Sequence, residues 1–115
     1  MILYNVTVKV DRRVAADWLN WMQEVHIPEV MMTNQFVEYR LMRILGEVED
    51  DGVTYAIQYL CASIEKFRKY QDDFAKRLQA EHSKRYKDRF VAFRTLMEMV
   101  DHNSKNISLE EMGAS

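Results

Sequence analysis

The stretch ILYNVTVKVDRRVAADWLNWMQEV, residues 2–25, changes its hydrophobic period partway along. Up to residue 10 every second residue is apolar, which predicts a strand that presents Ile2, Tyr4, Val6, Val8 and Val10 on one face. Beyond Asp11, a suitable helix N-cap, apolar residues recur three or four positions apart, as on one side of a helix. They are Val14, Trp18, Trp21, Met22 and Val25. The stretch therefore predicts a strand followed directly by an amphipathic helix.

The end of this first helix is marked by Pro28, which cannot donate a backbone hydrogen bond and restricts the residue before it. We expect the helix to stop or kink there, with Pro28 beginning a further short turn. His26 then lies at the rim of the apolar side.

Two more alternating segments, residues 36–48 and 53–62, flank the sequence Asp50-Asp51-Gly52. This pattern predicts a hairpin with a three-residue loop, in which Gly52 adopts the left-handed conformation. That loop would pair Leu45 with Ile57 and place the apolar residues of both strands on one face.

A second helix is predicted over residues 64–86, with Ser63 as its N-cap and a buried stripe toward His82 made by Ile64, Phe67, Tyr70, Phe74 and Leu78. Residues 90–100 then predict a last strand. Its apolar positions indicate that Val91, Phe93, Met97 and Met99 face the helices and that Ala92, Arg94 and Leu96 face away. We expect one domain over residues 1–100 and a polar, flexible tail over residues 101–115.

The order of elements is β-α-β-β-α-β. Right-handed crossovers turn this order into an α+β, ferredoxin-like fold, a four-stranded antiparallel sheet with both helices on one face. The other face would mix apolar residues with charged ones, which suits a surface covered by a second copy of the chain. We therefore expect a homodimer through this open sheet face.

Composition excludes several classes of function. The formal charge is −2, from 16 basic and 18 acidic residues, which favours neither a nucleic-acid binder nor a polyanion. The sequence contains no apolar run near the length that spans a bilayer and no glycine-rich phosphate loop. A single cysteine and three widely spaced histidines predict no disulfide and no metal site, and we expect no cofactor and a cytoplasmic location.

Four stretches carry a family resemblance: YNVTVKVD, WLNWMQEVHIPEVM, GVTYAIQY and RFVAFRTLMEMV. With them the chain resembles an uncharacterised bacterial family, a domain of unknown function within the dimeric α/β-barrel superfamily. The resemblance implies that two sheets meet face to face, with the helices outside. Relatives in the superfamily include antibiotic-biosynthesis monooxygenases, muconolactone isomerases, stress-response dimers and haem-degrading proteins. None of their catalytic motifs matches this sequence, so no catalytic residue is transferred.

His26 has two interpretations. It could act as a general base or a haem ligand in a pocket lined by Trp18, Met22, Tyr39 and Tyr55, because imidazole titrates near neutral pH. Alternatively, it could satisfy open carbonyl groups at the end of the first helix. We favour the structural role.

Further candidate ligand-binding residues lie on the sheet. An aromatic wall between sheet and helices would be formed by Trp18, Tyr39 and Tyr55 together with Tyr4, Tyr59, Phe93 and Trp21, although a plain core would use the same residues. Arg40, Gln58 and Arg94 are expected on the open face, where they could bind an acidic ligand or only pair across the dimer. The sequence thus predicts a dimeric domain that binds a small ligand or a protein partner, and leaves open a cofactor-free monooxygenase- or isomerase-like enzyme.

Overall fold

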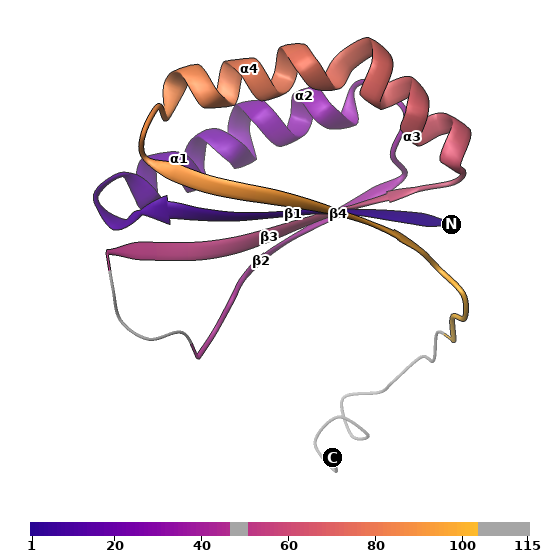
Figure 1. Cartoon of the computed structure of the whole chain (residues 1–115), viewed down its shortest axis with the longest axis horizontal. Coiled ribbons are helices and arrows are strands. Elements are labelled where there is room, and N and C mark those ends of the chain that lie inside the picture. Colours follow the sequence, from indigo (N-terminus) through magenta and orange to yellow (C-terminus); the bar gives the residue numbers. More distant parts are fainter. Residues whose placement is uncertain (47–50, 104–115) are drawn as a thin grey trace.

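The computed structural model describes residues 1–46 and 51–103. They form the predicted ferredoxin-like α+β fold, with an antiparallel sheet in the order β2-β3-β1-β4 and all helices on one face (Figure 1). The strands are β1 (Ile2–Asp11), β2 (Glu38–Arg43), β3 (Gly52–Cys61) and β4 (Phe90–Glu98). The helices are α1 (Ala15–Trp21), α2 (Ile27–Met31), α3 (Ile64–Tyr70) and α4 (Lys76–Arg85). None of these helices is long and apolar enough to cross a membrane.

The first helix does not stop at Pro28, but its α-helical hydrogen bonding is interrupted just before this residue, and Pro28 lies in the first turn of α2, close to the predicted start of a further turn. Asp11 accepts a hydrogen bond from the Arg13 backbone at 2.9 Å and caps a 3-10 turn, Arg12–Val14, that leads into α1. A π turn, Met22–His26, joins α1 to α2 without a break. In it the Ile27 N–H reaches back to the Met22 carbonyl, five residues earlier, and this wider turn accommodates the proline ring that follows.

The second helix also contains a π turn, Gln71–Ala75, between α3 and α4. Ser63 caps the N-terminus of this helix, at α3, as predicted: its side chain accepts a hydrogen bond from the Lys66 backbone N–H at 3.3 Å. The π turn shifts the phase of the buried stripe: Ala75 is buried, whereas Phe74, predicted to be buried, is only half-buried. The stripe then resumes at Leu78 and His82, which are both buried.

The two central strands present the predicted faces. Tyr4, Val8 and Val10 of β1 pack beside Ile57 and Cys61 of β3 under the helices, and all five side chains are buried. Burying one large apolar side chain stabilises a fold by about 1.5–3 kcal/mol, so these strands anchor the sheet.

The pairing of β2 with β3 differs from the prediction by four residues. Ile57 faces Leu41 rather than Leu45, and Leu45 is 76% exposed. Gly52 is the first residue of β3 and not a left-handed turn residue; in the described chain the glycine with positive φ is Gly46, at 79°. The remaining turn residue, Asp50, lies outside the described residues. An even shift keeps the strand faces, so Leu41 still points toward the helices.

The faces of β4 are the reverse of the prediction. Arg94 pairs with Val6 of β1, and paired residues share a face, so Arg94 belongs to the helix side. Val91 and Phe93 lie on the open side and are 70% and 64% exposed. The tail predicted to be flexible begins at Asp101, but residues 104–115 lie outside the described residues.

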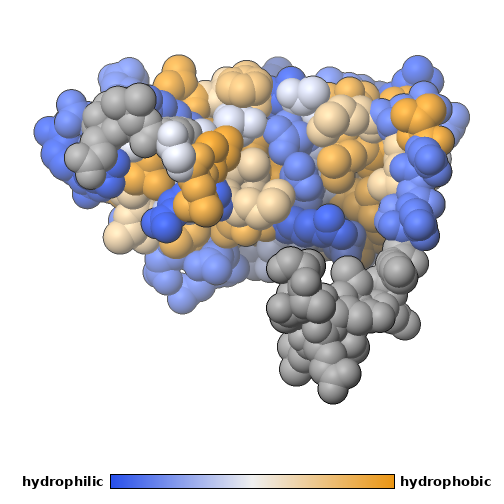
Figure 2. All heavy atoms as spheres, turned by 90° about the horizontal axis from the view of Figure 1, so that it is seen from below, coloured by the Kyte–Doolittle hydropathy of each residue, from blue (hydrophilic) through white to orange (hydrophobic). Residues whose placement is uncertain are grey.

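The open face of the sheet mixes apolar and polar side chains (Figure 2). The strand pairing places four polar residues in one row across its middle: Arg40, Gln58, Asn5 and Thr95. Exposed apolar residues lie on both edge strands, among them Met42 of β2 and Val91, Phe93 and Met97 of β4. This composition matches the mixed surface that the sequence predicted, except that β4 contributes Val91, Phe93 and Met97 in place of Arg94 and Leu96.

Candidate functional site

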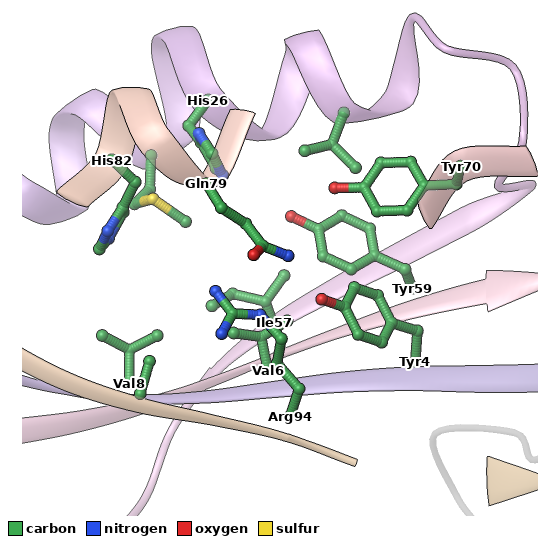
Figure 3. A pocket seen from close by; sticks show the side chains of 13 residues that line it. Tyr4, Val6, Val8, His26, Ile57, Tyr59, Tyr70, Gln79, His82 and Arg94 are labelled. Carbon is green, nitrogen blue, oxygen red and sulfur yellow. The ribbon is translucent and has the colours of Figure 1, made fainter. Parts of the chain in front are cut away.

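A small cavity lies between the sheet and the helices, near the middle of the molecule (Figure 3). Its volume is about 30 Å³, enough for one or two water molecules. Apolar residues of β1, β3 and β4 line its floor: Val6, Val8, Ile57 and Ala92. Polar side chains from both helices and from the same three strands surround the rest: Tyr4, Tyr59, Tyr70, His26, His82, Gln79 and Arg94.

Three tyrosines stand side by side at one end of the cavity. Tyr4 comes from β1, Tyr59 from β3 and Tyr70 from α3, and their hydroxyl groups point toward Gln79 and Arg94 (Figure 3). The ring of Tyr4 lies 6.1 Å from the rings of both others. Burial raises the pKa of all three phenols, so they remain neutral hydrogen-bond donors at pH 7.

Two histidines occupy the other end. His82 on α4 accepts a hydrogen bond at its Nε2 from Trp18 Nε1 at 2.8 Å, which fixes the neutral imidazole with its proton on Nδ1. His26 lies in the π turn, 5.7 Å from the His82 ring, and its buried Nδ1 has no hydrogen-bond partner. Burial is the main cause that lowers the pKa of both histidines to about 4, so both are neutral at pH 7.

Arg94 brings the one positive charge of the cavity lining. It lies on the helix side of β4 and forms a side-chain hydrogen bond with the Tyr4 hydroxyl. Within the described part of the chain it makes no ion pair with a carboxylate, and the cavity lining contains no Asp or Glu. Its guanidinium therefore offers donors without a matching negative charge.

A second, larger hollow adjoins this cavity at the edge of the sheet. It has a volume of about 370 Å³ and lies between the second helix and β4. Four residues line both spaces: Tyr4, Tyr70, Gln79 and Arg94. Phe67, Gln71, Ala75 and Leu96 complete the larger one. The two spaces together form an outer hollow and an inner, water-sized cavity with a shared polar boundary.

The structure regroups the two sets of candidate residues that the sequence proposed, one around His26 and one on the open face. His26 and Arg94, which was expected on the open face, line the cavity together. Trp18 and Tyr55 are core residues packed on each other at 4.9 Å, and Tyr39 is 44% exposed, so none of them lines it. The remaining two candidates, Arg40 and Gln58, lie on the open face beside Glu38, which is 3.5 Å from Arg40 in the same chain.

The structural interpretation of His26 is also wrong. His26 lies inside a continuous helix rather than at its end, and it faces the cavity (Figure 3). Its Nδ1 is buried and has no hydrogen-bond partner.

Sequence reasoning did not select Tyr70, Gln79 or His82 as site residues, and it named Tyr4 and Tyr59 only as members of the aromatic wall. The tyrosines did carry a signal, because so many phenols under one sheet need hydroxyl partners and indicate a partly wet layer. His82 was expected at the end of the buried stripe of the second helix, but without a role in a site. Gln79 carried no signal, because a π turn changes which side of a helix its downstream residues face. The described residues contain no cluster of three potential metal ligands among His, Cys, Asp and Glu, so no metal site is assigned.

Comparison with known proteins identifies a family and a fold. Residues 1–100 match the family described as a domain of unknown function, DUF4286. Curated proteins give no match. Among solved structures, a dimeric ferredoxin-like protein from an uncultured marine organism is 12% identical, with a TM-score of 0.70 over 91% of this chain and 100% of that one.

Two further structures are similar to this chain. An ethyl tert-butyl ether D family protein from Bacillus halodurans is 13% identical, with a TM-score of 0.62 over 86% of this chain and 100% of that one. A variant of SnoaB, a cofactor-independent oxygenase from Streptomyces nogalater, is 10% identical, with a TM-score of 0.60 over 90% of this chain and 98% of that one. At these identities the likeness shows a shared fold.

Proposed function

The chain belongs to the DUF4286 family, and we propose that it is a homodimeric domain that binds a small organic ligand between its sheet and its helices. One observation carries the proposal: within the described chain, His26 presents to the cavity a buried nitrogen without a hydrogen-bond partner. Beside it, the exposed Arg94 presents a guanidinium without a carboxylate. Buried polar groups are normally satisfied, so an exception facing a cavity indicates a missing ligand or water.

Binding fits the chemistry of this site better than catalysis does. A general base works best when its pKa lies near the working pH, and histidines with a pKa of about 4 are weak bases at pH 7. They are good hydrogen-bond acceptors in that state. The single cysteine, Cys61, is fully buried and donates to the Gln35 carbonyl at 3.1 Å, so it offers no nucleophile to the cavity.

An enzyme resembling cofactor-free monooxygenases or isomerases is the second candidate. It is supported by the fold shared with SnoaB and by the aromatic side chains beside the cavity. In this alternative the neutral phenols and imidazoles would orient a substrate that itself reacts with oxygen.

The homodimer is supported by the open face of the sheet. Phe93 and Val91 expose most of their surface there, beside the half-exposed Met97. Contiguous apolar residues on an exposed sheet are typical of a covered interface. A structurally similar protein is itself described as a dimeric ferredoxin-like protein. In the proposed dimer, a second copy covers this face and the ligand cavity stays on the helix side of each copy.

Native mass spectrometry of freshly purified protein tests the proposal. We expect a dimer mass with a small-molecule adduct that denaturing conditions release. Tyr70→Phe, which removes a hydroxyl that lines both the cavity and the adjoining hollow, should reduce adduct occupancy. Tyr39→Phe, which removes an exposed hydroxyl outside both, should not. A dimer that never carries an adduct and gives identical results for both variants contradicts the proposal. If aerobic incubation converts the released molecule only when the protein is present, the enzyme alternative takes its place.

A further inference from the structure

The linings of the two adjoining spaces have an unbalanced charge. Arg94 lines both, and neither lining includes an Asp or a Glu. The two histidines beside it are neutral, and the three phenols and the Gln79 amide carry no charge. One positive charge therefore faces the space without a negative counterpart in the described chain.

Building on the proposed function, we infer that the ligand is a small aromatic carboxylate held by Arg94. A guanidinium presents paired N–H donors that match the two oxygens of a carboxylate, and such charge-assisted bonds are stronger than neutral ones. Tyr4 and Gln79 lie next to Arg94 and add neutral donors to the same place (Figure 3). The arrangement therefore recognises a planar oxyanion rather than a neutral polar group.

The volumes of the two spaces set the orientation of this ligand. The inner cavity, at about 30 Å³, is too small for a ring, since benzene occupies engineered protein cavities of about 150 Å³. The outer hollow, at about 370 Å³, lies at the lower end of the range for small-molecule sites. The aromatic ring thus lies in the outer hollow against Phe67, Tyr70 and Leu96. The carboxylate points inward to Arg94, and the inner cavity keeps a water molecule against His26.

Two probes of the same shape test the charge preference. 2-Naphthoate is ionised at pH 7, whereas 2-naphthalenemethanol is neutral and similar in size. Titrations followed by NMR should show that the naphthoate binds wild-type dimer at least about tenfold more tightly than the alcohol does. Shifted resonances should include those of Arg94, Gln79 and Leu96.

Two substitutions of Arg94 separate the contribution of its positive charge from that of its planar guanidinium to naphthoate binding. Arg94→Gln should remove the preference for naphthoate and leave the affinity for the alcohol unchanged, and Arg94→Lys should keep only part of the preference. Arg40→Gln, on the open face, serves as the matched control and should leave both affinities unchanged. Because Arg94 lies exposed on an edge strand, its variants should keep the wild-type melting temperature, which circular dichroism checks.

The outcomes distinguish this inference from the proposed function. Equal affinities for the two probes in wild type, or an Arg94→Gln variant that keeps the preference, overturn the carboxylate while small-molecule binding stands. An adduct that proves to be a neutral molecule does the same. If neither probe binds and the purified dimer carries no adduct, the inference and the proposed function both fail.

Discussion

The two faces of the sheet contain similar kinds of residues but arrange them differently. On the helix face, tyrosines, histidines and one arginine converge on a small cavity, and the buried Nδ1 of His26 lacks a partner there. On the open face, polar residues are spread over the sheet, four of them in a row across its middle, with exposed apolar residues on both edge strands. An apolar surface identifies where something binds, whereas unpartnered polar atoms also indicate the chemistry of what binds.

The largest contrast between the faces should come from Trp18 in the helix-face core. Trp18→Ala should lower the free energy of unfolding by about 3–5 kcal/mol, because it opens a cavity and removes the donor to His82. Urea denaturation at pH 7 measures the change. Met32→Ala, at a position 76% exposed on the helix layer, is the control and should cost less than about 0.5 kcal/mol. Equal costs would show that the helix-face core is not closed.

A second effect should appear on lowering the pH. In the unfolded chain, histidine takes up a proton near pH 6.5, whereas in the folded chain His26 and His82 do so only near a pKa of about 4. The unfolded state therefore binds more protons between these values, and stability is full above pH 6.5 and falls as the pH drops toward 4. Each histidine contributes up to about 3 kcal/mol to this loss.

Urea denaturation at several pH values between 4.5 and 7.5 measures this loss. The double variant His26→Gln and His82→Gln should flatten the dependence, since glutamine can still accept from Trp18 and does not titrate. If the double variant loses stability with falling pH as steeply as wild type does, other groups cause the loss. The two buried histidines would then not differ from exposed polar residues in their effect on stability.

The open face should respond through association rather than folding. Introducing charge with Leu60→Glu and Phe93→Glu should weaken the proposed dimer by at least about tenfold, equivalent to 1.4 kcal/mol, because two like-charged sheets would face each other. Light scattering should report a monomer mass, while circular dichroism should show an unchanged fold. A variant that keeps the dimer mass would place the interface elsewhere.

The smallest effect is expected at Glu38, whose carboxylate lies 3.5 Å from the Arg40 guanidinium on the open face. Both side chains are about half or more exposed, so Glu38→Gln should change the free energy of unfolding by less than about 0.5 kcal/mol. The dissociation constant of the dimer should also stay within about twofold. A larger loss of affinity, measured by sedimentation over a range of concentrations, would show that this pair reaches across the interface.

The faces of the central strands were predicted correctly from the sequence, whereas those of the edge strand β4 were not. β1 and β3 are covered on the helix side and paired on both edges, so their alternation reports the faces correctly. β4 is an edge strand with apolar residues on both faces. On β4 the face with the bulkier apolar residues, Val91 and Phe93, was expected to pack against the helices. The face that lies on the helix side instead contains the small Ala92 and the charged Arg94, which line the cavity.

The site was less predictable than the fold. Its residues come from three strands and both helices, far apart in the sequence, and two π turns set the directions of His26 and Gln79. A helical pattern at 100° per residue cannot anticipate such turns. The loop between β2 and β3 failed for another reason: Asp50-Asp51-Gly52 is a good turn sequence, and local turn chemistry alone does not exclude a longer connection that begins near Gly46.

The π turns also affect how relatives of this chain should be compared. Each lies seven residues into its helix, at Met22–His26 and Gln71–Ala75, so the two halves of the fold repeat the same irregularity. Each π turn holds one extra residue in a single wide turn, so deleting one residue within it would restore an ordinary helix and leave the residues after it on the same face. Gln79 and His82 would then still face the cavity after such a deletion in the second helix. A single-residue gap within 22–26 or 71–75 in an alignment of homologues therefore leaves the residues on either side equivalent, and their side chains can be compared position by position.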